Sequence, residues 1–106
     1  MIQASGKDEK LLLVDDDKAF LQVLGKALTR RGYDVLTAMT SEDAQERARE
    51  HHPVYAVVDL KLDGESGLDL IQELKDIDDD MVIVVLTGYA GIATAVAAVK
   101  RGASNY

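Results

Sequence analysis

The sequence contains no cysteine and no tryptophan, and it has a single proline, Pro53. Without cysteine, disulfides and thiolate metal sites are excluded. Basic residues are in the minority, with 12 Lys and Arg against 19 Asp and Glu and a net charge of −7. This charge argues against binding of nucleic acid through its phosphates, and a cation or a basic protein surface is the more natural partner.

Long apolar runs are also absent. The longest, "MVIVVL" at 81–86, is too short to cross a bilayer, and residues 1–10 lack the apolar stretch of a signal peptide. We therefore expect a cytoplasmic protein with no membrane contact. The chain has 106 residues, of which 47% are hydrophobic and 29% charged, and this predicts one globular domain over residues 1–106.

Short apolar segments alternate along the chain with stretches of helical spacing. Strands are expected at 10–15, 33–38, 54–59 and 81–87, and helices around 20–28, 41–51, 68–74 and 90–102. This alternation, with short connections, predicts an α/β fold with a doubly wound parallel sheet covered by helices on both faces. The strand at 33–38 alternates polar with apolar residues, which suits an edge position.

The first two predicted helices differ in how much they can bury. The second is charged on most faces and has only Ala44 and Ala48 to bury. It should therefore have a narrow buried stripe and be mostly exposed to solvent. The first carries an apolar stripe that is expected to face the core. This stripe consists of Phe20, Val23, Leu24, Ala27 and Leu28.

Oxygen-bearing side chains stand at the ends of three of the predicted strands. Asp15, Asp16 and Asp17 follow the first strand, Asp59 ends the otherwise apolar "YAVVD", and Thr87 ends the fourth. Ligands of parallel α/β sheets bind at the carboxyl ends of the strands. If the first and third strands are neighbours, Asp15, Asp16 and Asp59 converge there with the Thr87 hydroxyl nearby. Such hard oxygen donors suit Mg²⁺, or Mn²⁺, whereas Asp17 fits the N-cap of the first helix.

Other interpretations compete with a metal site. Aspartate after a strand is common turn chemistry, so each residue taken alone is weak evidence of a site. A dinucleotide-binding fold needs glycines after the first strand, where this chain has aspartates. An aspartate-nucleophile hydrolase of the haloacid-dehalogenase kind needs a second aspartate two residues after Asp59, where this chain has Lys61. Two alternatives remain: a small metal-dependent phosphatase or phosphotransferase with an Asp nucleophile, and a flavodoxin-like cofactor-binding module.

From "LLLVDDD" to "GASNY", the chain resembles the receiver domain of two-component response regulators. The combination of Asp15 and Asp16, Asp59, "LTG" with Thr87 and "KRGASNY" carries the resemblance. "YAVVDLKL" and "VVLTGYAGIATAVAAVKRGA" look closest to the RegA/PrrA/ActR group of redox-responding transcriptional regulators. The resemblance implies a flavodoxin-like (CheY-like) fold with strand order 2-1-3-4.

The resemblance also implies a function for individual residues. Asp59 would accept a phosphoryl group from a sensor histidine kinase, in a signalling protein rather than an enzyme. Asp15, Asp16, Asp59 and the backbone carbonyl of Lys61 would hold Mg²⁺. Thr87 would hydrogen-bond the phosphoryl group, and Tyr106 would be the aromatic residue that turns inward on activation. DNA would be contacted only through an output domain that this chain lacks.

The chain departs from the family pattern in two places. Many receivers carry Met-Pro shortly after the phosphorylated aspartate, where this chain has Leu62-Asp63. Receivers also carry a lysine, followed by proline, three residues beyond the aromatic residue of the fifth strand, and this sequence ends at Tyr106. The resemblance therefore implies a receiver that is truncated in its fifth strand and lacks its fifth helix. Because this would leave an apolar edge and sheet face uncovered, self-association is expected.

Overall fold

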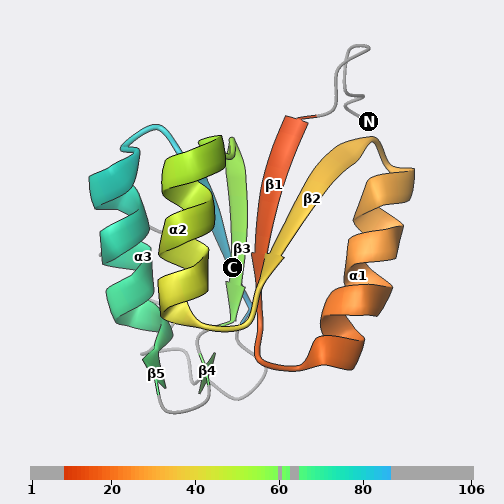
Figure 1. The fold of residues 1–106 in the computed structure, drawn as a ribbon, viewed down its shortest axis with the longest axis horizontal. Helices are drawn as coiled ribbons and strands as arrows, with labels where there is room; N and C mark the ends of the chain where they lie inside the picture. The colour runs from red at the N-terminus through yellow and green to blue at the C-terminus, as the bar shows by residue number, and fades with distance from the viewer. Residues whose placement is uncertain (1–8, 60, 63–64, 87–106) are drawn as a thin grey trace.

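The computed structural model describes residues 9–59, 61–62 and 65–86, which form an α/β domain (Figure 1). The predicted helix at 90–102 lies outside this part of the chain. The elements in chain order are β1 (Glu9–Val14), α1 (Lys18–Arg30), β2 (Tyr33–Ala38), α2 (Ser41–His51), β3 (Tyr55–Asp59), β4 (Lys61–Leu62), β5 (Glu65–Ser66), α3 (Gly67–Ile77) and β6 (Val82–Leu86).

Four of the strands form one parallel sheet in the order β2-β1-β3-β6. Because β6 is the fourth long strand of the chain, this is the expected order 2-1-3-4. The alternating strand β2 lies at an edge of the described sheet, as its pattern predicted. Strand β1 pairs with β2 on one side and with β3 on the other, so Val14 has Ala38 and Val58 as its register partners. The carboxyl ends of these strands therefore meet at one rim of the sheet.

The short strands β4 and β5 form a separate antiparallel pair after β3, with Lys61 opposite Ser66. Neither strand was predicted from the sequence. The signal for them is the Asp-Gly pair at 63–64, since two such residues between short extended segments are typical of a hairpin turn. This pair of strands lies directly before α3, at the end of the sheet where β3 ends (Figure 1).

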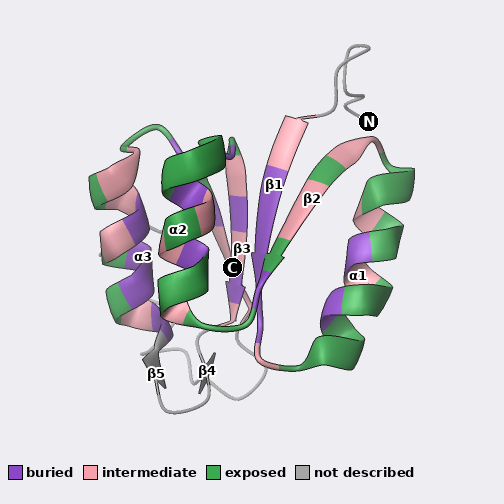
Figure 2. Cartoon of the chain, in the orientation of Figure 1, coloured by how far each residue is buried: buried purple, intermediate pink, exposed green. Residues whose placement is uncertain are grey.

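Helices α2 and α3 lie side by side on one face of the sheet, and α1 lies on the other (Figure 1). The α2/α3 face holds the larger core cluster, in which many residues have 0% of their surface exposed. Buried residues on α2, α3, β1 and β3 are coloured purple in Figure 2. Helix α2, which the sequence predicts to be mostly exposed, buries only Ala44 and Ala48, as expected. Small side chains at these two positions let the helix lie close to the sheet. This cluster includes Leu12, Val58, Leu70, Ile71, Leu74, Ile83 and Val85.

The predicted apolar stripe of α1 is wrong by about one residue. The buried positions are Leu21 and Gly25, with Leu24 and Leu28 half-buried against the second core cluster. Gly25 lies against β2, because a Cβ there would be 3.8 Å from Val35 Cγ1, an ordinary van der Waals contact. The side centred on Leu21 and Gly25 therefore faces the sheet. Phe20, Val23 and Ala27, which the sequence predicted to be core residues, are exposed.

Helix α1 begins with a side-chain cap, as the sequence predicted. The Phe20 amide donates to Asp17 Oδ1 at 3.1 Å, and Asp17 itself has extended backbone geometry. Helix α2 begins in the same way at Thr40, whose hydroxyl accepts from the Asp43 amide. None of the helices in the described ranges is long and apolar enough to span a membrane.

Removing the cap of α1 should lower stability without changing the fold. We expect Asp17→Ala to lower the free energy of unfolding by about 1 kcal/mol, because the Phe20 amide loses its acceptor. Asp17→Asn is the matched control, since asparagine caps a helix as well as aspartate does and should cost only a few tenths of a kcal/mol. Urea denaturation followed by circular dichroism measures both values. Equal losses for the two variants would assign the effect to charge rather than to capping.

Candidate metal centre

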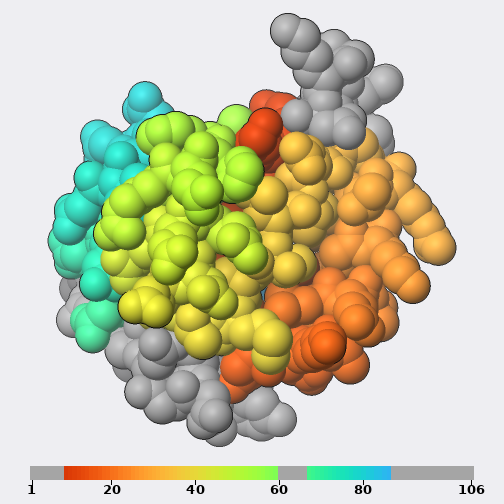
Figure 3. Space-filling view, viewed as in Figure 1, coloured from red at the N-terminus to blue at the C-terminus, as the bar shows by residue number. Residues whose placement is uncertain are grey.

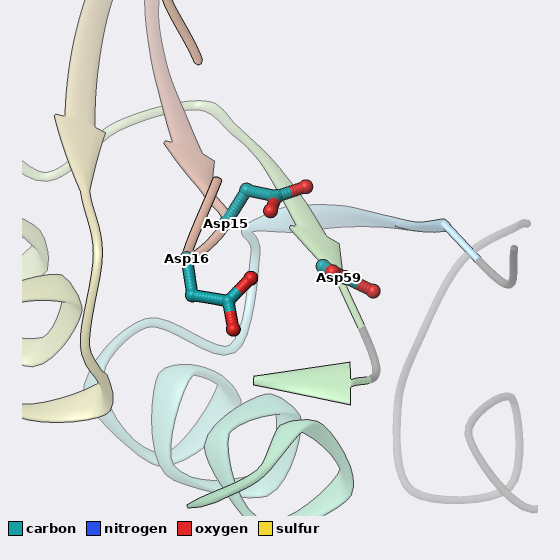
Figure 4. Close-up of side chains that lie close together, drawn as sticks. All are labelled: Asp15, Asp16 and Asp59. Carbon is teal, nitrogen blue, oxygen red and sulfur yellow. The ribbon is translucent and has the colours of Figure 1, made fainter. Parts of the chain in front are cut away.

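Three carboxylates meet at the rim where β1 and β3 end. Asp15 and Asp16 directly follow β1, and Asp59 is the last residue of β3. Since β1 and β3 are adjacent parallel strands, their ends project to the same side of the sheet. The side chains of Asp15 and Asp16 extend from the end of β1 towards the side on which Asp59 lies (Figure 4). The structure therefore brings together the three aspartates that the sequence predicted to converge.

The three carboxylates are close enough to share one cation. One carboxylate oxygen from each of Asp15, Asp16 and Asp59 lies within 4.8 Å of the other two. All the donors are hard oxygens, the ligand type that Mg²⁺ and Ca²⁺ prefer. Magnesium is held in proteins by one or two carboxylates together with waters. A group of three carboxylates, two of them partly accessible to solvent, supplies enough such ligands and leaves access for the waters.

Asp15 is the most enclosed member of this group, with 6% of its surface exposed. Two hydrogen bonds hold Asp15 in place. Its Oδ1 accepts from the Asp17 amide at 2.9 Å, and its own amide donates to the Ala38 carbonyl at 3.1 Å. Burial raises the pKa of the Asp15 carboxyl; the Asp17 amide opposes this rise, and the charges of Asp59 and Asp16 add to it. An Asp15 proton is therefore easier to retain here than in water.

Sequence reasoning missed the bonds that hold the site in place. The contact from the Asp17 amide to Asp15 is a turn in which an aspartate accepts from the amide two residues on. Consecutive aspartates after a strand are a sequence signal for such a turn. The support from Ala38 depends on the pairing of β1 with β2, which no local pattern reveals.

The other predicted site residues are less fully described. Thr87 and Tyr106 lie outside the described residues, so their predicted roles stay predictions. Lys61 begins β4, two positions after Asp59, and its backbone therefore lies just past the end of β3. The use of its carbonyl as a metal ligand also stays a prediction.

Comparison with protein families and curated proteins gives a consistent result. The model of the response regulator receiver domain matches residues 11–106. The photosynthetic apparatus regulatory protein RegA of Cereibacter sphaeroides is 50% identical over 95% of this chain and 55% of its own length. The acid tolerance regulatory protein ActR of Rhizobium meliloti is 46% identical over 95% of this chain and 52% of its own length. This chain thus spans about half the length of the curated relatives it matches.

Comparison with solved structures also gives response regulators and receiver domains. A response regulator from Burkholderia pseudomallei, crystallised with a phosphorylated aspartic acid, a calcium ion and citrate, is 46% identical with a TM-score of 0.89. That comparison covers 93% of this chain and 58% of the other. A CheY-like receiver domain from Methanospirillum hungatei is 28% identical with a TM-score of 0.89, covering 94% of this chain and 80% of its own. The comparisons give no support to a phosphatase or a flavodoxin-like cofactor module.

Proposed function

The chain belongs to the response regulator receiver domain family of two-component systems, similar to RegA and ActR, and we propose that Asp59 is its phosphoacceptor. The observation that carries this proposal is the position of Asp59, an acidic residue that ends an otherwise apolar strand beside Asp15 and Asp16. Apolar packing accounts for the other residues of β3 and gives no reason for an acid there. A carboxylate at this rim is in place to act as a nucleophile.

The reaction is the transfer of a phosphoryl group between two side chains. A carboxylate oxygen of Asp59 attacks the phosphorus atom of a phosphohistidine on a partner kinase, a P–O bond forms and the P–N bond breaks. The product is an acyl phosphate on Asp59 and a dephosphorylated histidine. The domain therefore works as a signalling component that takes part in its own phosphorylation, and not as an enzyme acting on free substrates.

Asp15 and Asp16 have a supporting role in this proposal. With Asp59 and the backbone carbonyl of Lys61, they would hold Mg²⁺. When bound, the cation supplies positive charge that offsets the charge of the transferring phosphoryl oxygens. The Asp17 amide and the Ala38 carbonyl keep Asp15 in place for this task. The family relationship, together with the calcium ion in the similar Burkholderia structure, supports a divalent cation here.

The conformational change that follows phosphorylation is proposed from the family pattern. The Thr87 hydroxyl would donate to a phosphoryl oxygen, and the Tyr106 ring would turn inward to occupy the space that Thr87 leaves. Phosphorylation supplies new charge and new hydrogen-bond acceptors, so it can favour one of two packings of these residues. The position of Thr87, directly after β6 in sequence, supports its half of this proposal.

The partners are likewise proposed from the family. A sensor histidine kinase in the cytoplasm would donate the phosphoryl group. Since the chain spans about half of RegA and ActR, an output region of the kind found in transcriptional regulators would carry any contact with DNA. The receiver itself, with a net charge of −7, is unsuited to direct contact with the phosphate backbone of DNA.

Phosphorylation by acetyl phosphate in the presence of Mg²⁺ tests the proposal. The parent chain should gain the mass of one phosphoryl group, and Asp59→Asn should gain none, because its amide is not a nucleophile. Asp34→Asn is the matched control, since it removes an aspartate from β2 whose contact is an exposed pair with Lys10. Intact-mass spectrometry measures the uptake. Equal labelling of the parent and Asp59→Asn, or no labelling of the parent, would contradict the proposal.

A further inference from the structure

The outer edge of β2 carries backbone groups that point away from the sheet. The Ala38 carbonyl accepts from the Asp15 amide and therefore points towards β1. Because backbone groups of successive residues in a strand point to alternate sides, those of Tyr33, Val35 and Thr37 point outward. Within the described residues β2 pairs only with β1, so it is an edge strand. Such an edge is a template for pairing with another strand.

One of these outward groups is already occupied by a side chain. Arg47, a half-buried residue of α2, donates through Nε to the Thr37 carbonyl at 3.1 Å. The surface formed by β2 lies between α2 and α1 in the space-filling view (Figure 3). The guanidinium thus takes up an acceptor that an incoming strand would need, and it brings a charge to that position. Charged side chains at a sheet edge are a common protection against pairing.

We propose that Arg47 prevents the β2 edge from pairing with β2 of a second copy of this chain. A two-fold antiparallel pairing of two β2 strands would place Val35 opposite Val35 and Thr37 opposite Tyr33. In this register Tyr33, Val35 and Thr37 all present their outward backbone groups to the other copy. Asp34 would lie opposite Leu36, so the two acidic residues would not face each other. The β2 edges of two copies could therefore pair with each other except at the Thr37 carbonyl, which Arg47 occupies.

The comparison of Arg47→Ala with Arg49→Ala tests this role. Both variants remove one arginine from α2, but Arg49 bonds to Gln45 of the same helix at 3.2 Å and not to the sheet. Sedimentation velocity over a concentration series measures self-association of the parent and both variants. We expect Arg47→Ala to associate at least about tenfold more tightly than Arg49→Ala, because each two-fold dimer of the parent must break two Arg47 bonds.

The surface used by the dimer is identified by amide exchange. In Arg47→Ala, the amides of Val35 and Thr37 should become protected from hydrogen exchange as the concentration rises. Equal association of Arg47→Ala and Arg49→Ala would overturn the proposal. So would association of Arg47→Ala without protection of these two amides, since the dimer would then use another surface. The test does not depend on phosphorylation, so it stands apart from the proposed function.

Discussion

Asp15→Asn is expected to stabilise the metal-free protein and to weaken its binding of Mg²⁺ by at least about tenfold. In the absence of metal, a buried carboxylate beside Asp16 and Asp59 is destabilising, because burial and like charges both oppose its ionised form. Asparagine removes the charge and keeps an oxygen that can accept from the Asp17 amide. The gain in the free energy of unfolding near pH 7 should be on the order of 1 kcal/mol.

The pH dependence of this gain has a definite direction. The pKa of Asp15 is raised in the folded state, so the folded protein binds its proton more tightly than the unfolded chain does. The parent therefore loses stability as the pH rises from the ordinary value of 3.8 through the raised pKa of Asp15. The advantage of Asp15→Asn should be full above that pKa and should vanish as the pH falls below 3.8.

Magnesium should reverse the order of stability of the two proteins. Binding to the folded state alone stabilises the parent in proportion to the logarithm of the metal concentration. Asp15→Asn should respond much less, because it has lost one of three charged ligands. Asp17→Asn is the control, since it removes a charge from the same turn, keeps the cap of α1 and should respond as the parent does. Thermal unfolding with and without Mg²⁺ measures this, and an equal response of the parent and Asp15→Asn would contradict the assigned site.

The site was predictable because it depends on strand ends. Each of the three aspartates closes an apolar segment of β1 or β3, and parallel strands in a doubly wound sheet place such ends at a common rim. Strand-end patterns alone left open whether β1 and β3 are neighbours; the strand order implied by the resemblance made them so, and the pairing of Val14 with Val58 confirms it. The cap at Asp17 was predictable for a related reason: a short polar acceptor stood directly before the helical spacing began.

The orientation of α1 was not predictable from apolar residues alone. Two stripes one residue apart share Leu24 and Leu28, and counting apolar side chains favours the one that contains Phe20 and Val23. The structure uses the one that contains Leu21 and Gly25, the two buried residues of the helix. Glycine contributes nothing to a hydrophobic pattern, so counting apolar side chains does not find a buried stripe that contains Gly25.

Because of this packing, the two faces of the sheet should contribute unequally to stability. Leu74 of α3 is fully buried in the α2/α3 cluster, whereas Leu28 of α1 is half-buried in the smaller cluster on the other face. Leu74→Ala removes methylene groups from a tightly packed region and leaves a cavity. It should lower the free energy of unfolding by about 3–4 kcal/mol. This is a large share of the roughly 5–15 kcal/mol that holds a domain of this size folded.

Leu28→Ala is the matched variant on the α1 face and should cost only about 1 kcal/mol. Part of the Leu28 side chain already contacts solvent, so less apolar area is lost and water can fill the space. Urea denaturation of both variants, with the slope compared to that of the parent, measures the difference. Equal losses would mean that α1 packs as tightly as α3. A larger loss for Leu28→Ala would contradict the orientation of α1 in which Leu21 and Gly25 face the sheet.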